Sequence, residues 1–553
     1  MKRFLYTFLA LGITTATMAV PARPNGKQVT QTDGSTITIY QHGDEYFHWV
    51  TNAQGEWLKR NEQGLYETTT SLSDNEKMAQ HQRIAPRCIT QSAQTAYPIN
   101  LAPRGLIILV NFADTTFRYN KALITDMLTG ENWTRDYYYT DKGKEYHVVS
   151  KGSARQYFID QSKGQYQPEF NVIGPYQVSQ KMEYYGTNRG SFDGHPEEMI
   201  VEACQLANED GYDFSQYDAN NDGKIDFVYV IYAGYGEADS YIDNTIWPHS
   251  YTLSERYYKP TQRGGYGKDT VYLDGKILDL YACGNEINCY SEQLMGIGNF
   301  CHEFGHVLGL PDLYNDNIKT QGQWDIMDYG IYNNDCNTPP AYSAYERFFL
   351  GWSTPTLLNQ AADITLHELQ SSNAIGLISP SGEHNLVGND PAPTTFYLLE
   401  NRQLKDWDTY LPGHGLILTK VTYNYNRWLN NAINRSEADM AIDLIEADGQ
   451  TSASGLNFYG KQTDAFPAGK TEYTEINGYP ITDIVEKGEI ISFKFMGGGH
   501  HKPLAIDDAL TGETIIAIYD LLGHNCGQNL NKLSNGVYIV STTQNTRKVI
   551  IRN

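Results

Sequence analysis

Two histidines and a glutamate lie at metal-binding spacing near the middle of the chain, where residues 302–314 read HEFGHVLGLPDLY. On a helix, His302 and His306 project from one face about one turn apart, with Glu303 beside them. Zinc held by three protein ligands keeps a fourth position for water, lowers the pKa of that water to about 7 and polarises a peptide carbonyl. These residues therefore predict a zinc site in which Glu303 takes a proton from zinc-bound water and returns it to the leaving amine.

The residues after the second histidine offer a third ligand. Gly309 can adopt the left-handed conformation that ends a helix, and Pro311 cannot continue one. This turn would bring Asp312 back toward the ion, and a carboxylate is an accepted zinc ligand. The alternative is Glu346, which lies further along the chain in the helical pattern AYSAYERFFLGW. The turn favours Asp312, but the sequence leaves both ligands open.

A second motif, WDIMDYG, occupies residues 324–330. A methionine turn with a tyrosine two residues later resembles the second signature of the metzincin proteases. We therefore expect Met327 to pack beneath the metal without binding it. Tyr329 could donate its hydroxyl to the developing oxyanion or bind zinc weakly, and a position in the core is the alternative.

A separate acidic loop, YDANNDGKIDF, occupies residues 217–227. Oxygen-bearing side chains stand at alternate positions in it: Asp218, Asn220, Asp222 and Asp226. With Gly223 at a sharp turn and the carbonyl of Lys224 as a further ligand, the loop resembles the first nine positions of an EF-hand. Tyr229 replaces the bidentate glutamate, so we predict a structural calcium ion and no helix-loop-helix switch. An ordinary Asp/Asn/Gly turn is the alternative.

Hydrophobic patterning indicates the elements that must position these groups. The runs RGLIILVNFAD (104–114) and FVYVIYAG (227–234) are typical of strands buried on both faces. Between them, HPEEMIVEACQLANEDG has helical spacing, so a β-α-β arrangement should lead into a helix that starts near Met295. After Trp352, short strands with frequent Gly, Pro and Asn predict a β-rich region.

The N-terminal residues indicate export. Residues 1–22 place Lys2 and Arg3 before an apolar run that ends in small residues, as in a secretory signal peptide. The mature chain should then begin near Val20 to Arg23. Residues 23–95 alternate polar and apolar positions between turn signals and predict β-hairpins, which in front of a protease form a candidate propeptide.

The amino-acid composition limits the kinds of binding partner that can be expected. The chain of 553 residues has 42 Lys plus Arg against 65 Asp plus Glu, a net charge of -23. This charge is unfavourable for nucleic acid and anionic membranes, and no stretch after the signal peptide is apolar enough to span a bilayer. Seven cysteines leave at least one unpaired. Cys283 and Cys289 are close enough in sequence to bridge a short loop.

Motifs spread over residues 100 to 495 together resemble the immune inhibitor A-like secreted metalloproteases. They read GSARQYF, GPYQVS, DANNDGKIDFVYVIYAG, IWPHS, HEFGHVLGLPDLY, WDIMDYG, LENRQ and LPGHG. The resemblance implies a calcium-stabilised zinc endopeptidase of metzincin-like architecture that is made with an N-terminal propeptide. It also implies His302, His306 and Asp312 as the zinc ligands and Glu303 as the general base.

Two further resemblances concern export and latency. The stretch from about residue 503, with IYDLLG, GVYIV and KVIIRN, is similar to the sorting domain of type IX secretion cargo. This implies that the outer-membrane machinery of a Gram-negative bacterium is a partner, and that the protein is released or held at the cell surface. Cys88, in PRC at the end of the propeptide, resembles the thiol that blocks zinc in latent metzincins, although an odd cysteine explains it equally well.

The sequence thus predicts an α+β multidomain protein, with a mixed sheet and an active-site helix in the protease domain and β-rich domains on both sides. The expected parts are a signal peptide (1–22), a β-rich propeptide (23–95), a zinc metalloprotease domain with the calcium loop (96–355), a β-rich domain that completes the protease (356–498) and a sorting domain (503–553). The expected function is zinc-dependent hydrolysis of peptide bonds in extracellular proteins. The alternative is an inactive surface adhesin or binding module that kept the fold, against which the intact Glu303 argues.

Overall fold

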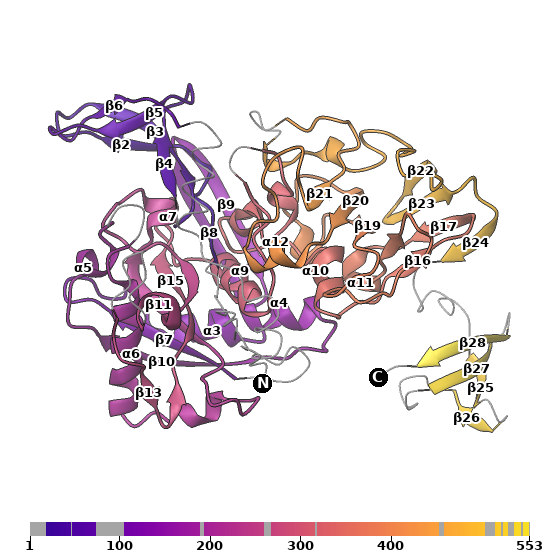
Figure 1. Ribbon diagram of the computed structural model, residues 1–553, viewed down its shortest axis with the longest axis horizontal. Coiled ribbons are helices and arrows are strands. Elements are labelled where there is room, and N and C mark those ends of the chain that lie inside the picture. The colour runs from indigo at the N-terminus through magenta and orange to yellow at the C-terminus, as the bar shows by residue number, and fades with distance from the viewer. Residues whose placement is uncertain are drawn as a thin grey trace, which may run out of the picture.

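The computed structural model describes residues 18–45, 47–72, 104–188, 193–258, 267–315, 318–452, 458–503, 515–520, 524–528, 536–542 and 546–551. These residues form a mixed α+β structure built from several sheets (Figure 1). The predicted signal peptide up to residue 17 and Cys88 lie outside the described residues. No helix within the described ranges is long and apolar enough to cross a membrane.

A six-stranded sheet, in the order β1-β12-β15-β11-β7-β10, forms the scaffold of the first half. Its parallel strands are β7 (Arg104–Asn111), β10 (Glu169–Gln177), β11 (Val228–Tyr235) and β15 (Leu280–Ile287). At one edge, β12 (His249–Thr252) runs antiparallel to β15, and β1 (Met18–Ala19) runs antiparallel to β12. The two predicted buried strands are therefore confirmed as neighbours, β7 and β11.

Alternate residues of β7 enter two different cores, because successive side chains of a strand point to opposite faces. Ile107 and Leu109 pack with the helix α9 (Ile297–Val307), which carries the histidine motif. Leu106 and Ile108 pack with the helix α6 (Pro196–Glu209) on the other face. The sheet is thus covered on both sides, which explains why β7 and β11 are continuously apolar.

Shorter elements surround this sheet. The helices are α3 (Lys121–Thr129), α4 (Ala154–Gln161), α5 (Met182–Gly186), α7 (Glu237–Ser240), α8 (Leu253–Arg256) and α10 (Ala344–Phe349). The 3-10 turns are η1 (Phe214–Tyr217), η2 (Gly322–Trp324) and η3 (Tyr329–Tyr332). Two hairpins complete this part, β8 (Thr134–Asp141) with β9 (Lys144–Lys151) and β13 (Tyr272–Leu273) with β14 (Lys276–Ile277).

A β-rich region follows, as the sequence predicts, on the right of Figure 1. One sheet contains β16 (Thr356–Leu358), β18 (Gly376–Ile378), β19 (Thr395–Arg402), β20 (Gly415–Thr422) and β21 (Ile442–Leu444). The other contains β22 (Ile481–Lys487), β23 (Ile490–Phe495), β17 (Ala362–Leu366) and β24 (His500–Pro503). The connecting elements are α11 (Leu369–Ser372), η4 (Asp406–Asp408), α12 (Tyr425–Leu429) and η6 (Gln462–Asp464).

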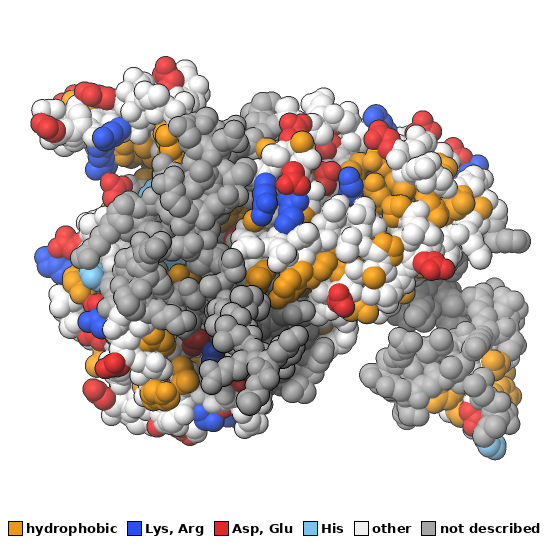
Figure 2. Space-filling view, in the orientation of Figure 1, with side chains coloured by type: hydrophobic (Ala, Val, Ile, Leu, Met, Phe, Trp, Pro, Cys, Tyr) orange, Lys and Arg blue, Asp and Glu red, His pale blue; other side chains and the backbone are white. Residues whose placement is uncertain are grey.

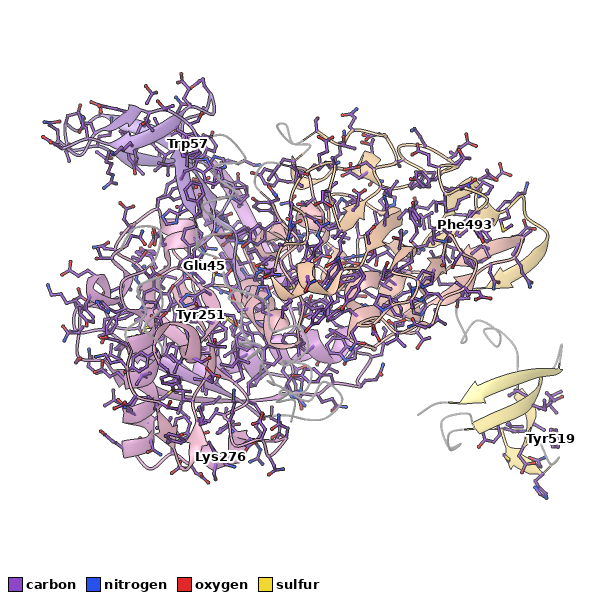
Figure 3. All side chains as sticks on the ribbon, in the orientation of Figure 1. Glu45, Trp57, Tyr251, Lys276, Phe493 and Tyr519 are labelled. Carbon is purple, nitrogen blue, oxygen red and sulfur yellow. The ribbon has the colours of Figure 1, made fainter. Side chains whose placement is uncertain are left out.

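The β-rich region shares a core with the helix that carries the histidines. Phe396 of β19 and Trp428 of α12 belong to the same buried cluster as Phe304 of α9. The opposite faces of β19 and β20 pack on Phe493, which is labelled in Figure 3. Because the cluster is continuous, the β-rich region can place side chains at the histidine motif. Hydrophobic side chains are also visible on the surface of this region in Figure 2, and Val485 and Ile490 of β22 and β23 are exposed.

Two small sheets lie at the ends of the described chain. The N-terminal one contains β2 (Lys27–Thr30), β3 (Thr36–Gly43), β4 (His48–Thr51), β5 (Trp57–Arg60) and β6 (Tyr66–Thr68) in sequential order. This confirms the predicted hairpins over residues 27–68, and residues 73–95 of that prediction lie outside the described residues. The C-terminal one has the order β26-β25-β27-β28 and is built from β25 (Ile515–Asp520), β26 (Asn525–Gly527), β27 (Gly536–Thr542) and β28 (Thr546–Ile551). Trp57 and Tyr519 mark these two sheets in Figure 3.

The suggested bridge between Cys283 and Cys289 is wrong, because both thiols are free. Cys283 lies inside β15 and is buried in the core on the α6 face of the sheet. Cys289 follows the strand and contacts the amine of Lys27 instead. The short separation in sequence does not bring the two thiols together, because their side chains face different surroundings.

Candidate metal centre

Helix α9 is buried along its whole length, which fixes the orientation of its polar side chains. Phe300 and Phe304 pack on the sheet, and their rings stack 5.9 Å apart. A Cβ atom on Gly305 would lie 2.8 Å from the sulfur of Met327, so glycine is needed there for Met327 to pack beneath the helix. The predicted helix start near Met295 is therefore confirmed, and Met327 packs against this helix.

Backbone carbonyls orient both histidines. The Nδ1 atoms of His302 and His306 lie 2.8 Å from the carbonyl oxygens of Ile326 and Leu310. Because a carbonyl can only accept a hydrogen bond, each Nδ1 carries the proton and each Nε2 keeps a lone pair free for a metal. The two Nε2 atoms are 3.1 Å apart and face the same point.

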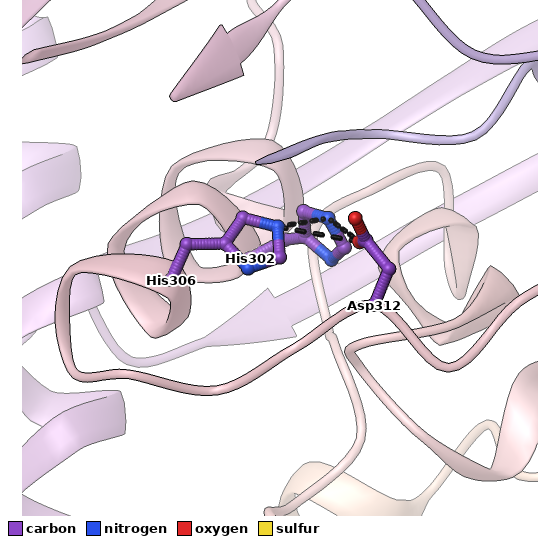
Figure 4. A group of neighbouring side chains, drawn as sticks. All are labelled: His302, His306 and Asp312. Carbon is purple, nitrogen blue, oxygen red and sulfur yellow. Dashed lines mark hydrogen bonds and ion pairs between the residues drawn. The ribbon is translucent and has the colours of Figure 1, made fainter. Parts of the chain in front are cut away.

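Asp312 returns to the histidines through the turn after α9. Gly309 has a φ of 95°, and its N–H donates to the His306 carbonyl, so the helix ends as the sequence predicts. One carboxylate oxygen of Asp312 then lies 3.3 Å from the Nε2 atom of each histidine (Figure 4). Burial alone would raise the pKa of Asp312, but the two histidines hold it well below its usual range.

These separations fit a zinc ion. Three ligand atoms about 2.0–2.1 Å from a tetrahedral zinc ion lie about 3.3 Å from one another. The measured distances are 3.1, 3.3 and 3.3 Å. Within the part of the chain that the structure describes, this is the only group in which three His, Cys, Asp or Glu side chains bring ligand atoms within 4.8 Å of one another.

A residue that the sequence did not suggest holds Asp312 in place. Asn431, just after α12, donates through Nδ2 to the second carboxylate oxygen of Asp312 at 2.6 Å. Its own Oδ1 accepts the backbone N–H of Asp312 at 2.8 Å. Nearby, the Asn434 side chain donates to the Leu313 carbonyl at 2.9 Å. The β-rich region therefore fixes the loop that carries the candidate third ligand.

Glu303 lies next to the histidines and is fully buried. Burial raises the pKa of its carboxyl well above the usual value, and the nearby Asp312 raises it further. The nearby backbone amide of Val20 lowers the pKa in part, but neither carboxylate oxygen has a hydrogen-bond partner among the described residues. A carboxyl with a raised pKa beside this His–His–Asp group suits a residue that accepts and then releases a proton.

The N-terminal segment Met18–Arg23 runs through this site. Its backbone pairs antiparallel with β12, with Ala19 opposite His249. The indole N–H of Trp247 then donates to the Val20 carbonyl at 2.9 Å, and the Tyr332 hydroxyl donates to the Pro21 carbonyl. A ribbon in the indigo of the N-terminus passes beside the three side chains in Figure 4. The segment thus lies along the edge of the sheet and past Glu303.

Tyr329 begins the turn η3 and is buried. Its ring packs against Phe458 and Tyr459, with ring centres 5.4 and 5.2 Å apart, and lies 6.4 Å from the ring of Tyr314. This aromatic packing matches the core alternative for Tyr329. Its role at the metal stays a prediction.

Glu346, the alternative ligand, is used elsewhere in the fold. It stands at the third position of α10 and accepts the Ser343 backbone N–H at 2.6 Å, forming a capping box. Burial and the neighbouring carboxyl of Asp325 raise the pKa of Glu346 well above its usual value. A glutamate that closes the start of its own helix is not placed beside the two histidines, so the geometry favours Asp312.

The acidic loop is ordered by its own backbone. Asp218 accepts the N–H groups of Asp222 and Gly223 at 2.9 and 3.1 Å and pairs with the Lys276 amine at 2.6 Å. Gly223 has a φ of 86°, which confirms the predicted sharp turn. Burial, with Asp218 and Asp222 nearby, raises the pKa of Asp226 to about 7. The carboxylates of this loop do not converge as those of the His–His–Asp group do.

Comparison with known proteins gives the class of this site. Residues 101–354 match the family model described as immune inhibitor A peptidase M6, catalytic domain. This range includes the six-stranded sheet apart from β1, and it includes α9, Asp312 and α10. The match supports a metallopeptidase domain in this part of the chain.

Two relatives point to the same class. Immune inhibitor A from Bacillus thuringiensis subsp. alesti is 27% identical over 282 residues, which cover 44% of this chain and 39% of the relative. The pre-pro-metalloprotease PrtV from Vibrio cholerae serotype O1 is 26% identical over 310 residues, which cover 48% of this chain and 31% of the relative. The matches therefore span less than half of each relative's length.

No sequence motif indicated two of the candidate functional residues, Asn431 and Arg23. Asn431 lies in WLNNAINR, where its φ of 44° is a conformation that asparagine tolerates, but nothing local connects it with Asp312. Arg23 lies within the range expected for the mature N-terminus, and no motif marks its buried contacts. Both residues act across long separations in sequence, which a local pattern cannot report.

Proposed function

We propose that this chain is a zinc-dependent endopeptidase of metzincin-like architecture that hydrolyses peptide bonds in proteins outside the cell. The observation that carries the proposal is the convergence of His302, His306 and Asp312 beside Glu303, within a region that matches a metallopeptidase family. Their separations suit zinc, and the Met327 turn packs beneath them.

Each residue of the site has a separate role in the proposed reaction. Zinc held by the two histidines and Asp312 would polarise the scissile carbonyl and acidify a water molecule. Glu303 takes the proton from the attacking water and passes it to the leaving amine. The backbone amide of Val20 lies against Glu303, so the nitrogen of a bound chain can stand where Glu303 would protonate it. Tyr329 remains a candidate for oxyanion stabilisation.

The N-terminal segment supports cleavage within chains. Adding a strand to a free sheet edge is a common way to bind an extended peptide. Met18 and Ala19 pair with β12 before the site, and Pro21 to Arg23 continue beyond it. A substrate bound in this way would extend on both sides of the reacting bond, as an endopeptidase requires.

The same segment supports a latent precursor. Because Arg23, its last residue, is held in a closed position beside the edge that a substrate would use, we propose that residues 23–95 act as a propeptide that keeps the enzyme inactive until it is released. Cys88, the expected zinc-blocking thiol, lies outside the described residues and stays a prediction. Arg23, the first residue of the proposed propeptide, offers a latency contact that needs no cysteine.

Casein hydrolysis tests the protease function. The matured wild-type protein should cleave casein in a way that a zinc chelator stops, and Glu303→Gln should lose at least about 100-fold in rate, since general acid–base catalysis contributes about 10²–10⁴-fold. Equal activity of both proteins would refute the role of Glu303. No activity in the matured wild type would favour the inactive adhesin.

Calcium remains part of the proposal for the acidic loop. Asp218, Asn220, Asp222, Asp226 and the carbonyl of Lys224 are the proposed ligands. The turn at residue 223 and the raised pKa of Asp226 support it, because a cation would relieve the repulsion between these carboxylates. The Lys276 amine at Asp218 is a competing positive charge.

Export is proposed from both ends of the chain. We infer that residues 1–22 direct export and that residues 503–553 engage the type IX secretion machinery of a Gram-negative bacterium, so that the protein is released or held at the surface. The antiparallel sheet of β25 to β28 is compatible with a small sorting domain. Deletion of residues 503–553 should retain the protein inside the cell, and unchanged export would refute this role.

A further inference from the structure

The N-terminal segment delivers a charged side chain into a closed socket. Arg23 donates through one terminal nitrogen to the Asn288 side chain at 2.9 Å and through the other to the Asp335 carboxylate at 2.9 Å. Its guanidinium lies 4.1 Å from the ring centre of Tyr290 and 5.6 Å from that of Tyr332. Its side chain is 4% exposed. Arg23 is therefore bound as a ligand would be, by charge, hydrogen bonds and aromatic faces.

The four socket residues Asn288, Tyr290, Tyr332 and Asp335 all come from the sequence range that matches the metallopeptidase family. The socket is also ordered independently of the arginine. The Tyr137 hydroxyl and the Asn288 side chain both donate to Asp335, at 2.7 and 2.9 Å. Release of the N-terminal segment would thus leave a prepared arginine site on the protease.

After Arg23 leaves, the buried charge of Asp335 favours binding of another cation in this socket. The carboxylate side chain of Asp335 is 1% exposed, and Arg23 supplies its cation. Burial would raise the pKa of Asp335, but Arg23 and the hydrogen bonds keep it below the usual value. A buried carboxylate that loses its partner is strongly destabilised, so an empty socket would attract another cation. A guanidinium fits best, because it can use both hydrogen-bond acceptors and the aromatic faces together.

The position of the socket along the segment is also defined. The pairing of Ala19 with His249 and the bond from the Trp247 indole to the Val20 carbonyl lead the segment past Glu303 at Val20. The Val20 nitrogen thus marks the place of a leaving amine. Arg23 follows Val20 by three residues, and the intervening Ala22 donates its N–H to Gly43 of the N-terminal sheet. The socket therefore corresponds to the fourth residue on the C-terminal side of a cleaved bond.

We propose that the Asn288–Tyr290–Tyr332–Asp335 socket is a substrate subsite that selects arginine at the fourth position after the cleaved bond. This inference rests on the proposed protease function. In the precursor, Arg23 occupies the subsite, and in the released enzyme an arginine of a protein substrate takes its place. Substrates with a basic residue at that position would be cleaved in preference to neutral ones.

Quenched fluorescent peptides test this subsite. The matured full chain is given peptides that differ only at the fourth residue after the cleaved bond, which carries arginine, citrulline or glutamate, and mass spectrometry identifies the cleaved bond. Citrulline keeps the shape of arginine without its charge. The arginine peptide should have a kcat/KM at least about ten-fold above that of the citrulline peptide, since loss of one partner of a buried charge pair weakens binding strongly.

A substitution in the socket provides the second arm. In Asp335→Asn, the kcat/KM for the arginine peptide should fall close to that for the citrulline peptide. The citrulline peptide should still be cleaved. Asp136→Asn, on the exposed face of β8, is the matched control and should keep the full preference. The citrulline comparison uses the unaltered protein, so the test does not depend on the folding of a variant.

The outcomes separate the two proposals. Cleavage of arginine and citrulline peptides at equal rates by the wild type would overturn the subsite and leave the protease function intact. A preference that survives Asp335→Asn would overturn the assignment to this socket. Failure to cleave any peptide, or casein, would overturn the protease function and the subsite with it.

Discussion

Replacement of Asn431 by alanine is expected to weaken zinc binding without touching a zinc ligand. The change removes the 2.6 Å bond to the Asp312 carboxylate and the 2.8 Å bond to its backbone N–H. A hydrogen bond to a charged group contributes about 1.5–3 kcal/mol, which corresponds to about 10–150-fold in an equilibrium constant. This agrees with the about 10–100-fold loss of metal affinity seen when residues that orient metal ligands are changed.

The assay is the zinc dissociation constant, measured by competition with a chromophoric chelator on the full chain. Asn426→Ala is the matched control, because Asn426 is an exposed asparagine of α12 and lies away from the Asp312 contacts. Asn431→Asp should weaken zinc at neutral pH as well, since it replaces a donor by a second negative charge beside Asp312. Far-UV circular dichroism confirms that each variant is folded.

An unchanged zinc affinity in Asn431→Ala, with a folded protein, would refute this reasoning. It would mean that Asp312 keeps its orientation without the β-rich region, or that it is not a ligand. Asp312→Ala distinguishes these cases, because it should lose far more zinc affinity than Asn431→Ala if Asp312 binds the ion.

The remaining predictions concern the ligand choice, latency and the acidic loop. Glu346→Gln should keep stoichiometric zinc by elemental analysis while Asp312→Ala should not, and the reverse pattern would exchange their roles. Arg23→Ala should raise casein hydrolysis by the unprocessed chain, because breaking a buried ion pair costs about 3–5 kcal/mol and would loosen the N-terminal segment; continued full latency would show that other contacts suffice. Calcium should raise the Tm of the wild type but not that of Asp218→Asn, and an equal shift in both would remove the loop from consideration.

Local features of the site were predictable from the sequence. The glycine at position 309 and the proline at 311 end α9 and turn the chain, and the structure places Asp312 where that turn leads. The apolar runs gave β7 and β11 because both faces of the sheet are covered. In each case the controlling residues are neighbours in sequence, so a local pattern was sufficient.

Glu346 shows how a motif can have two meanings. It stands three residues after Ser343, the spacing of a capping box, and this local role is the one the structure reveals. A glutamate on a helix after a metal motif fits both readings, and only the packing of α10 decides between them.

Other parts of the site depend on contacts between distant segments. Asn431 reaches Asp312 across 119 residues, and Arg23 reaches Asp335 across 312. Neither pair carries a shared motif, because the polar atoms meet only after the sheets and α9 have packed. A single sequence therefore indicates the candidate ligands but not the residues that hold them, nor the segment that covers them.

Anomalous scattering at the zinc edge, measured on crystals of the zinc-loaded full chain, tests the central claim most directly. One strong peak is expected about 2.0–2.2 Å from Nε2 of His302, Nε2 of His306 and a carboxylate oxygen of Asp312. A peak bound by Glu346, or no peak between the two histidines in protein that contains stoichiometric zinc, would contradict it.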